Sequence, residues 1–98
     1  MDSMYRRDFP ELFRLVDEPS VPVLYIPKMR EFGIERPGDE SFQLIHYCPI
    51  TGIKLPPSVR DTYFDEMERM GVSVFDPGYA EKLPEEFFEE EWWRRRGL

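Results

Sequence analysis

Apolar positions recur at helical spacing near the start of the chain, and the segments that follow show the two-residue alternation of strands. The first helical set is Phe9, Leu12, Phe13 and Val16. These positions share one face and predict a short helix over residues 8–16, which needs docking to persist. Asp8 is expected to cap this helix, with Glu11 completing a capping box and Pro10 in the first turn.

Alternation then predicts three strands, over residues 21–26, 31–36 and 41–47. Pro22 has no amide hydrogen to donate, so we expect it at a strand start or on a sheet edge. Pro37 and Gly38 occupy the centre of a type II turn between the second and third strands. The simplest assembly is an antiparallel meander. Residues 72–75 are compatible with a further short strand.

The best helix is predicted over residues 58–70. Ser58 is expected to cap it, Asp61 follows three residues later, and Gly71 ends it. A short aromatic helix is expected in the C-terminal segment 83–96, where glutamates precede arginines in the order that the helix dipole favours.

Pairs four residues apart support this C-terminal helix, Glu90 with Arg94 and Glu91 with Arg95. Phe88 is expected to stack on Trp92. We expect one of the two tryptophans in the core and the other half exposed.

The fold class that follows is α+β: a small antiparallel sheet of two to four strands, a turn and a packed helix. Ninety-eight residues with fifteen aromatic side chains suffice for one domain over residues 1–98. Its parts are an N-terminal helix or arm (1–20), the sheet and turn (21–55), the main helix (58–70) and the C-terminal segment (83–96). The predicted packing places the main helix over the sheet.

The formal charge is −7, from 13 basic and 20 acidic side chains. Binding to phosphate backbones requires a basic surface, so nucleic acid is not an expected partner. No apolar run is long enough to span a bilayer, and a single cysteine fits a reducing, cytoplasmic compartment.

The turn after the third strand resembles a zinc knuckle that lacks one ligand. Cys48 and Gly52 occupy the first and fifth positions, but Thr51 stands where the second thiolate belongs. We expect no cofactor, and expect Cys48, Thr51 and Gly52 to be structural. The hypothesis is that Thr51 replaces the metal by hydrogen bonding within the turn.

An ordered series of motifs resembles a family of small, uncharacterised, mostly bacterial proteins. That family carries a YCPWCGKKLP knuckle, an RDxWFDELE helix and an IPEEF…WW ending. The matching stretches are 47–56, 58–68, 83–87 and Trp92-Trp93, with a weaker match over 25–34. Thr51 departs from the pattern, as does the N-terminal stretch, which lacks the cysteines of other members. The family has no assigned activity, so the resemblance supports the fold and leaves the function open.

Two function classes stay open. The favoured one is a non-enzymatic module that binds another protein, through a positively charged surface on that partner. Trp92, Trp93 and Arg94 are its candidate contact residues. The alternative is a small metal protein or thiol enzyme that uses Cys48 and His46. The sequence predicts no oligomeric state.

Overall fold

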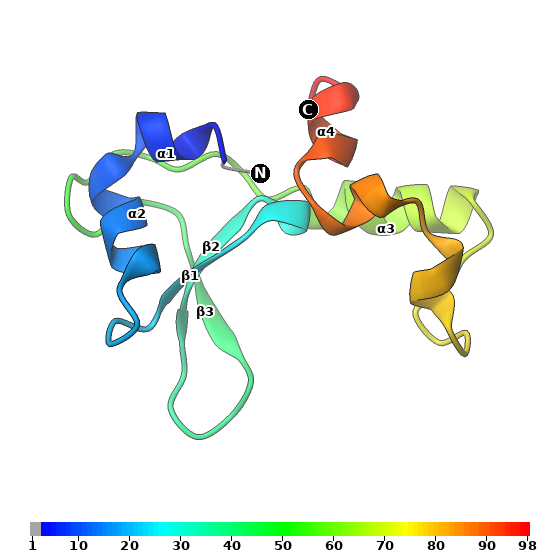
Figure 1. The fold of residues 1–98 in the computed structure, drawn as a ribbon, viewed down its shortest axis with the longest axis horizontal. Helices are drawn as coiled ribbons and strands as arrows, with labels where there is room; N and C mark the ends of the chain where they lie inside the picture. The colour runs from blue at the N-terminus through cyan, green and yellow to red at the C-terminus, as the bar shows by residue number, and fades with distance from the viewer. Residues whose placement is uncertain (1–2) are drawn as a thin grey trace. The chain divides into compact units, whose positions relative to one another are not determined.

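The computed structural model describes residues 3–98; Met1 and Asp2, part of the predicted N-terminal arm, lie outside the described residues. Its elements in chain order are α1 (Tyr5–Asp8), α2 (Pro10–Asp17), β1 (Val23–Ile26), η1 (Pro27–Met29), β2 (Glu31–Glu35), β3 (Phe42–Ile45), α3 (Arg60–Arg69), η2 (Tyr79–Lys82), η3 (Glu85–Phe88) and α4 (Glu91–Arg95). The η elements are 3₁₀ helices. Within the described residues, four α-helices and a three-stranded antiparallel sheet make an α+β fold, as predicted (Figure 1).

The chain divides into two compact units. Unit 1 comprises the chain up to Ile26 together with Glu31–Pro57, and unit 2 comprises Pro27–Arg30 and Ser58–Leu98. The sheet belongs to unit 1 and α3 to unit 2. We predicted a single domain with the main helix packed over the sheet. Because the sheet and this helix belong to different units, that packing stays a prediction.

The sheet of unit 1 is the predicted meander, in the order β1-β2-β3 (Figure 1). Tyr25 pairs with Phe32, which pairs with Ile45 across the sheet. β1 is an edge strand and Pro22 immediately precedes it, so the position expected for this proline is confirmed. Gly38 has a φ of 87°, as the third position of a type II turn requires.

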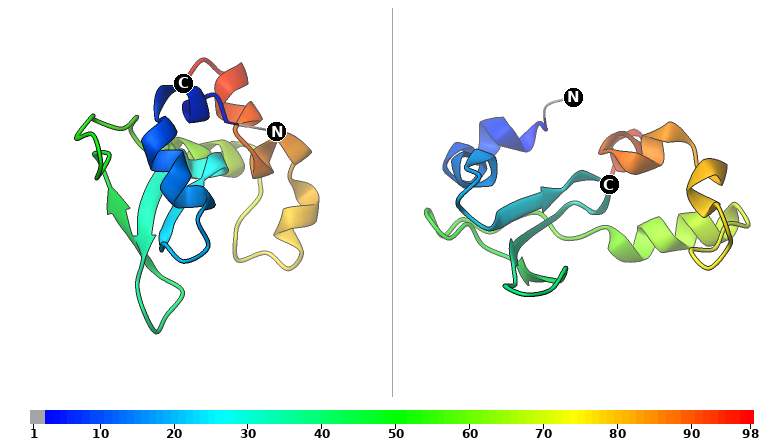
Figure 2. Two further views of the ribbon diagram at one scale, coloured as in Figure 1. Left: turned by 60° about the vertical axis from the view of Figure 1, so that its left-hand side comes forward. Right: turned by 60° about the horizontal axis from the view of Figure 1, so that its bottom comes forward.

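α2 packs on one face of the sheet through aromatic rings (Figure 2). The ring of Phe13 meets Tyr25 edge-on at 5.4 Å and Phe32 at 6.0 Å, and Tyr25 stacks on Phe32 at 4.6 Å. Such aromatic pairs add stability beyond their buried area. These rings form the core of unit 1.

The predicted cap of this helix is wrong. Asp8 is the last residue of α1, and the N-cap of α2 is Phe9, with φ −131° and ψ 61°. The amide of Phe9 donates to the carbonyl of Tyr5, so the preceding turn is already helical and cannot supply an extended capping residue. Pro10 does start α2, as predicted.

On the other face of the sheet, the ring of Phe42 covers Gly33, which is buried. A Cβ atom built there would collide with the ring of Phe42, and would lie 3.0 Å from the carbonyl oxygen of Gln43. Because Leu44 pairs with Gly33 in the ladder, Phe42 lies diagonally across this position. The glycine is therefore a packing requirement of the ring rather than a turn residue.

α3 in unit 2 starts two residues later than predicted. Val59 is the N-cap, because its φ of −111° is not helical and its amide donates to the carbonyl of Met29 at 2.9 Å. Ser58 still acts at this end, since its hydroxyl accepts the amide of Arg60 at 3.1 Å. Asp61 lies in the first turn, where a carboxylate favours the helix dipole.

α3 ends in a Schellman motif at Gly71, as the sequence predicted for that residue. The amide of Gly71 donates to the carbonyl of Glu68, and the amide of Val72 donates to that of Met67. Gly71 has a φ of 75°, the left-handed conformation that this motif requires.

The fourth strand considered over residues 72–75 is wrong. The segment leaves α3 as irregular chain and turn, and Phe75 is 92% exposed. The amide of Ser73 donates to the carboxylate of Asp76, and the amide of Asp76 donates to the carbonyl of Ser73. These local bonds close a turn and remove the extended backbone that a strand needs.

Candidate functional site

The knuckle of unit 1, residues 46–55, is a tight hydrogen-bonded turn. The amide of Cys48 donates to the carbonyl of Ile53, and the amide of Gly52 donates to the carbonyl of Cys48, both at 2.8 Å. Gly52 has a φ of 75°, which a side chain would oppose. The hydroxyl of Thr51 accepts the amide of Ile53 at 3.3 Å. The turn therefore closes through its own backbone and one side chain.

The thiol of Cys48 is 2% exposed and reduced. Burial raises its pKa, but hydrogen bonds from the Thr51 side chain and from the amides of Thr51 and Ile50 lower it, and the net pKa lies below the ordinary value of 9.0. The negative charge of Glu11 raises the pKa of the thiol and so opposes this lowering. The sulfur thus sits among the donors that a metal-bound thiolate accepts in a knuckle.

His46 does not share this environment, since its side chain is exposed. Within residues 3–98 no group of three or more His, Cys, Asp or Glu side chains is arranged to hold a metal ion.

Both tryptophans of the C-terminal segment are buried, so the expected half-exposed ring is wrong. Trp92 is fully buried and Trp93 is 2% exposed. The indole N–H of Trp92 donates to the carbonyl of Lys28 at 2.7 Å, and that of Trp93 donates to the carbonyl of Pro27 at 2.8 Å. The pair therefore ties α4 to η1 inside unit 2.

The stacking partner of Trp92 is Phe87 rather than Phe88. Their rings lie 5.3 Å apart and nearly parallel, and Phe88 is 44% exposed. Tyr63 of α3 meets both buried rings, at 5.6 Å from Phe87 and 5.4 Å from Trp92. The 3₁₀ geometry of η3 shifts the inward face by one residue from the helical register that the sequence suggested.

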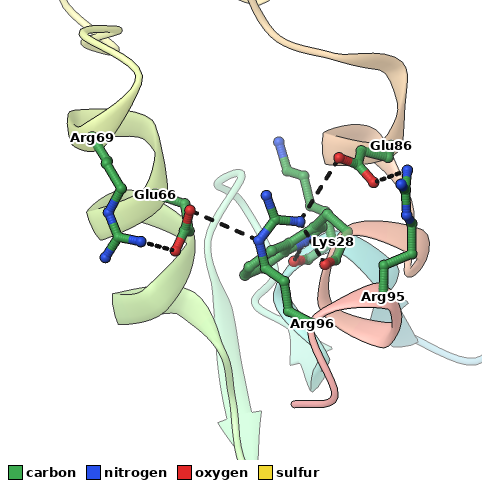
Figure 3. Close-up of polar contacts among 7 residues, drawn as sticks. Lys28, Glu66, Arg69, Glu86, Arg95 and Arg96 are labelled. Carbon is green, nitrogen blue, oxygen red and sulfur yellow. Dashed lines mark hydrogen bonds and ion pairs between the residues drawn. The ribbon is translucent and has the colours of Figure 1, made fainter.

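Arg96 is a residue whose role sequence reasoning missed (Figure 3). It lies between Glu66 and Glu86, at 3.8 and 3.7 Å, and donates to the carbonyl of Trp92 at 2.8 Å. Its guanidinium also lies 5.1 Å from the centre of the Phe87 ring. In the sequence, the spacing of four residues between Trp92 and Arg96 was the signal that they are neighbours on a helix.

The neighbouring arginines are ion-paired as well. Arg94 lies 3.8 Å from Glu90, the predicted pair, and Arg95 pairs at 3.0 Å with Glu86 rather than with the predicted Glu91. The segment containing Trp92, Trp93 and Arg94 is thus organised around internal contacts.

A groove lies beside β1 in unit 1, with a volume of about 390 Å³. Its lining residues are Val16, Glu18, Pro19, Ser20, Val21, Pro22, Val23, Leu24, Tyr25 and Glu35. All four residues of β1 are partly exposed, so apolar strand surface faces solvent here. The exposed surface of the wall is mixed, with slightly more polar than apolar area, and Glu18 and Glu35 contribute carboxylates to it.

Local hydrogen bonds hold the segments that carry these two carboxylates. The carboxylate of Glu18 accepts the hydroxyl of Ser20 at 3.0 Å and holds the loop between α2 and β1. Glu35 is exposed at the end of β2, and its amide donates to the carbonyl of Pro22 at 2.8 Å. Sequence reasoning missed this groove, because it depends on where the loop folds against the strand. Pro19 and Pro22 within the loop were the local signal for it.

Residues 8–95 match the family described as a domain of unknown function, DUF6980. The chain belongs to this family. The DUF6980 domain therefore includes the knuckle, the groove and the tryptophan pair. No curated protein and no solved structure matches the chain. Among residues 3–98, no helix has the length and apolar content to cross a membrane.

Proposed function

We propose that this DUF6980 domain is a small, non-enzymatic module that binds another protein through a positively charged surface on that partner. The observation that carries the proposal is the groove along β1. It combines partly exposed apolar strand residues with the carboxylates of Glu18 and Glu35. Interfaces of this kind gain affinity from apolar burial, and orientation from a few charges.

The charge balance supports a basic partner. The chain carries a net charge of −7, which attracts cationic surfaces and repels nucleic acid. The ion pairs of unit 2 use the carboxylates of Glu66, Glu86 and Glu90. Glu35 is exposed at the groove, where a partner's lysine or arginine can reach it.

The groove takes the place of the contact surface first expected at Trp92, Trp93 and Arg94. Aromatic contact residues act by burying their rings against a partner. Both rings are already buried in unit 2, and their N–H groups are already bonded to carbonyls of η1. Their role in this proposal is to hold α4 in place.

The module is proposed to work without a metal, in the cytoplasm. Bacterial relatives with a second knuckle cysteine in place of Thr51 would hold the metal that this chain has replaced by hydrogen bonds. A strong chelator should leave the melting temperature unchanged. A lowered melting temperature would instead support the metal-dependent alternative at Cys48 and His46.

The proposal is tested by affinity capture with two charge-reversal variants. Glu35→Lys changes the groove, and Asp65→Lys makes the same change on the exposed surface of α3. A specific partner should be captured by the wild type and by Asp65→Lys, and lost with Glu35→Lys. Equal capture by all three proteins overturns the groove assignment, and no specific capture by the wild type overturns the binding function.

A further inference from the structure

We infer that the partner enters the groove as an extended chain segment and adds a fourth strand to the sheet at β1. This inference rests on the proposed function and names the class of ligand, an extended peptide that carries a lysine or arginine. Three features of unit 1 carry it: the direction of the backbone groups of β1, the groove beside them and the charge at its wall.

The hydrogen-bond alternation of the sheet fixes the direction of the backbone groups. The carbonyl of Pro22 accepts the amide of Glu35, so Pro22 and Glu35 form a hydrogen-bonded pair. In an antiparallel ladder these pairs alternate, so Leu24 opposite Gly33 is the next one. The N–H and C=O of Val23 therefore point away from β2, toward the outer edge of the sheet.

The groove borders the strand that carries these outward-pointing groups. Its wall contains Val23 and Leu24 of β1 together with the loop from Glu18 to Pro22. An added strand lies about 4.8 Å from its neighbour, and its backbone pairs with outward-pointing groups such as those of Val23. A helix satisfies its own backbone groups and has none to offer this edge. The groove thus fits an extended segment better than a helical one.

The opposite edge of the sheet is built differently. There Arg36 and Ser41 form a hydrogen-bonded pair, so Ile34 with Gln43 is the next one and the carbonyl of Leu44 points outward. The side-chain amide of Gln43 donates to that carbonyl at 3.2 Å. The side chain of Gln43 thus already uses one of the acceptor sites at the outer edge of β3.

The wall also selects the side chains of the segment. Alternate residues of an extended peptide point to the same side, so one set contacts Val21 and Val23. Glu35 stands at the end of the groove next to Pro22, and Glu18 stands in the loop. A lysine or arginine flanking a β-branched residue matches this order of apolar and acidic groups.

The experiment uses the full ¹⁵N-labelled chain and the probe peptide acetyl-Lys-Val-Lys-Val-Lys-Val-amide. A second probe has the same sequence but carries N-methyl groups on two consecutive central residues, which removes a donor from both of its edges. We expect the first probe to shift the amide resonances of Val23 and Glu35. The methylated probe should bind about fivefold more weakly or worse, as the loss of one net hydrogen bond predicts.

Variants of the chain complete the test. Val23→Pro removes the outward amide and should weaken the first probe by a similar factor, while Asp65→Asn should leave it unchanged. Glu35→Gln, which keeps the backbone, should weaken the lysine probe and not a glutamine analogue of it. Equal binding of both probes, with Glu35 still required, overturns strand addition and leaves the acidic groove of the proposed function standing. Resonance shifts confined to other surfaces overturn the assignment of the site.

Discussion

The backbone amide of Glu35 donates a 2.8 Å hydrogen bond to the carbonyl oxygen of Pro22. This bond extends the β1–β2 ladder one residue beyond β1, to a proline that can accept but not donate. It also decides which residues of β1 pair with β2 and which face the outer edge. The groove, its charge and the proposed partner all depend on this register.

Proline substitutions in β1 test the register directly. Val23→Pro removes an outward amide, so the free energy of unfolding should fall by no more than about 1 kcal/mol. Leu24→Pro removes an amide that faces β2, and should cost about 1–3 kcal/mol or prevent folding. Urea unfolding followed by circular dichroism measures both. The reverse order of stabilities would show that the alternation is assigned the wrong way round.

Gly33→Ala should destabilise unit 1 by about 1–3 kcal/mol, the usual cost of overpacking. Its new Cβ meets the ring of Phe42 and approaches the carbonyl of Gln43. Chemical unfolding of the single variant, of Phe42→Leu and of the double variant gives the coupling between the two sites. Part of the loss should be recovered when the ring is smaller, and strict additivity would contradict the collision.

Trp92→Phe should lower the free energy of unfolding by about 1–3 kcal/mol. The variant keeps an aromatic ring against Phe87 but leaves the carbonyl of Lys28 without the indole donor that it has at 2.7 Å. Phe88→Leu, at a 44% exposed ring in the adjacent η3, is the control and should change stability by less than about 0.5 kcal/mol. Equal losses in thermal unfolding would mean that the two rings contribute alike.

Thr51→Val should raise the pKa of the Cys48 thiol, because the side-chain hydrogen bond from Thr51 is one of the groups that lower it. Thr51→Ser, which keeps the hydroxyl, is the matched control. The ¹³Cβ shift of the single cysteine, followed against pH, reports the thiol alone. Identical titration curves for the valine and serine variants would show that the Thr51 hydroxyl does not lower the pKa of the Cys48 thiol.

The lowered pKa of the Cys48 thiol also makes the free energy of unfolding depend on pH. Folding lowers the pKa of this thiol below its ordinary value of 9.0, so the stabilisation is present above the unfolded pKa and is lost as the pH falls through the folded pKa. The free energy of unfolding should therefore rise with pH between the folded and the unfolded pKa. The rise should be smaller in Thr51→Val than in Thr51→Ser.

Alternation and glycine positions made the local structure predictable. The three strands lie within the ranges predicted for them, and Gly38 and Gly71 adopt the positive φ that their turns require. The local sequence pattern gave a wrong prediction where local hydrogen bonds favour a different backbone structure. Residues 72–75 alternate like a strand, but the bonds between Ser73 and Asp76 close a turn instead.

The candidate site was less predictable, because its parts come from distant positions. The donors of Trp92 and Trp93 reach carbonyls 64 and 66 residues earlier in the chain, so no local window shows that both rings are buried. The groove joins a loop to the edge of a strand. Only the knuckle was visible in advance, because its contacts join residues that are close in sequence.

The most direct measurement of the central claim is site-specific photo-crosslinking in cells. A benzoylphenylalanine at Val21 lies in the wall of the groove, and one at Phe75 replaces a ring that is 92% exposed in unit 2. Position 21 should give a discrete adduct to a lysine- or arginine-rich segment of one protein, which disappears with Glu35→Lys, and position 75 should not. Equal adducts from both positions, or adducts from position 75 alone, would contradict a binding module that works through the β1 groove.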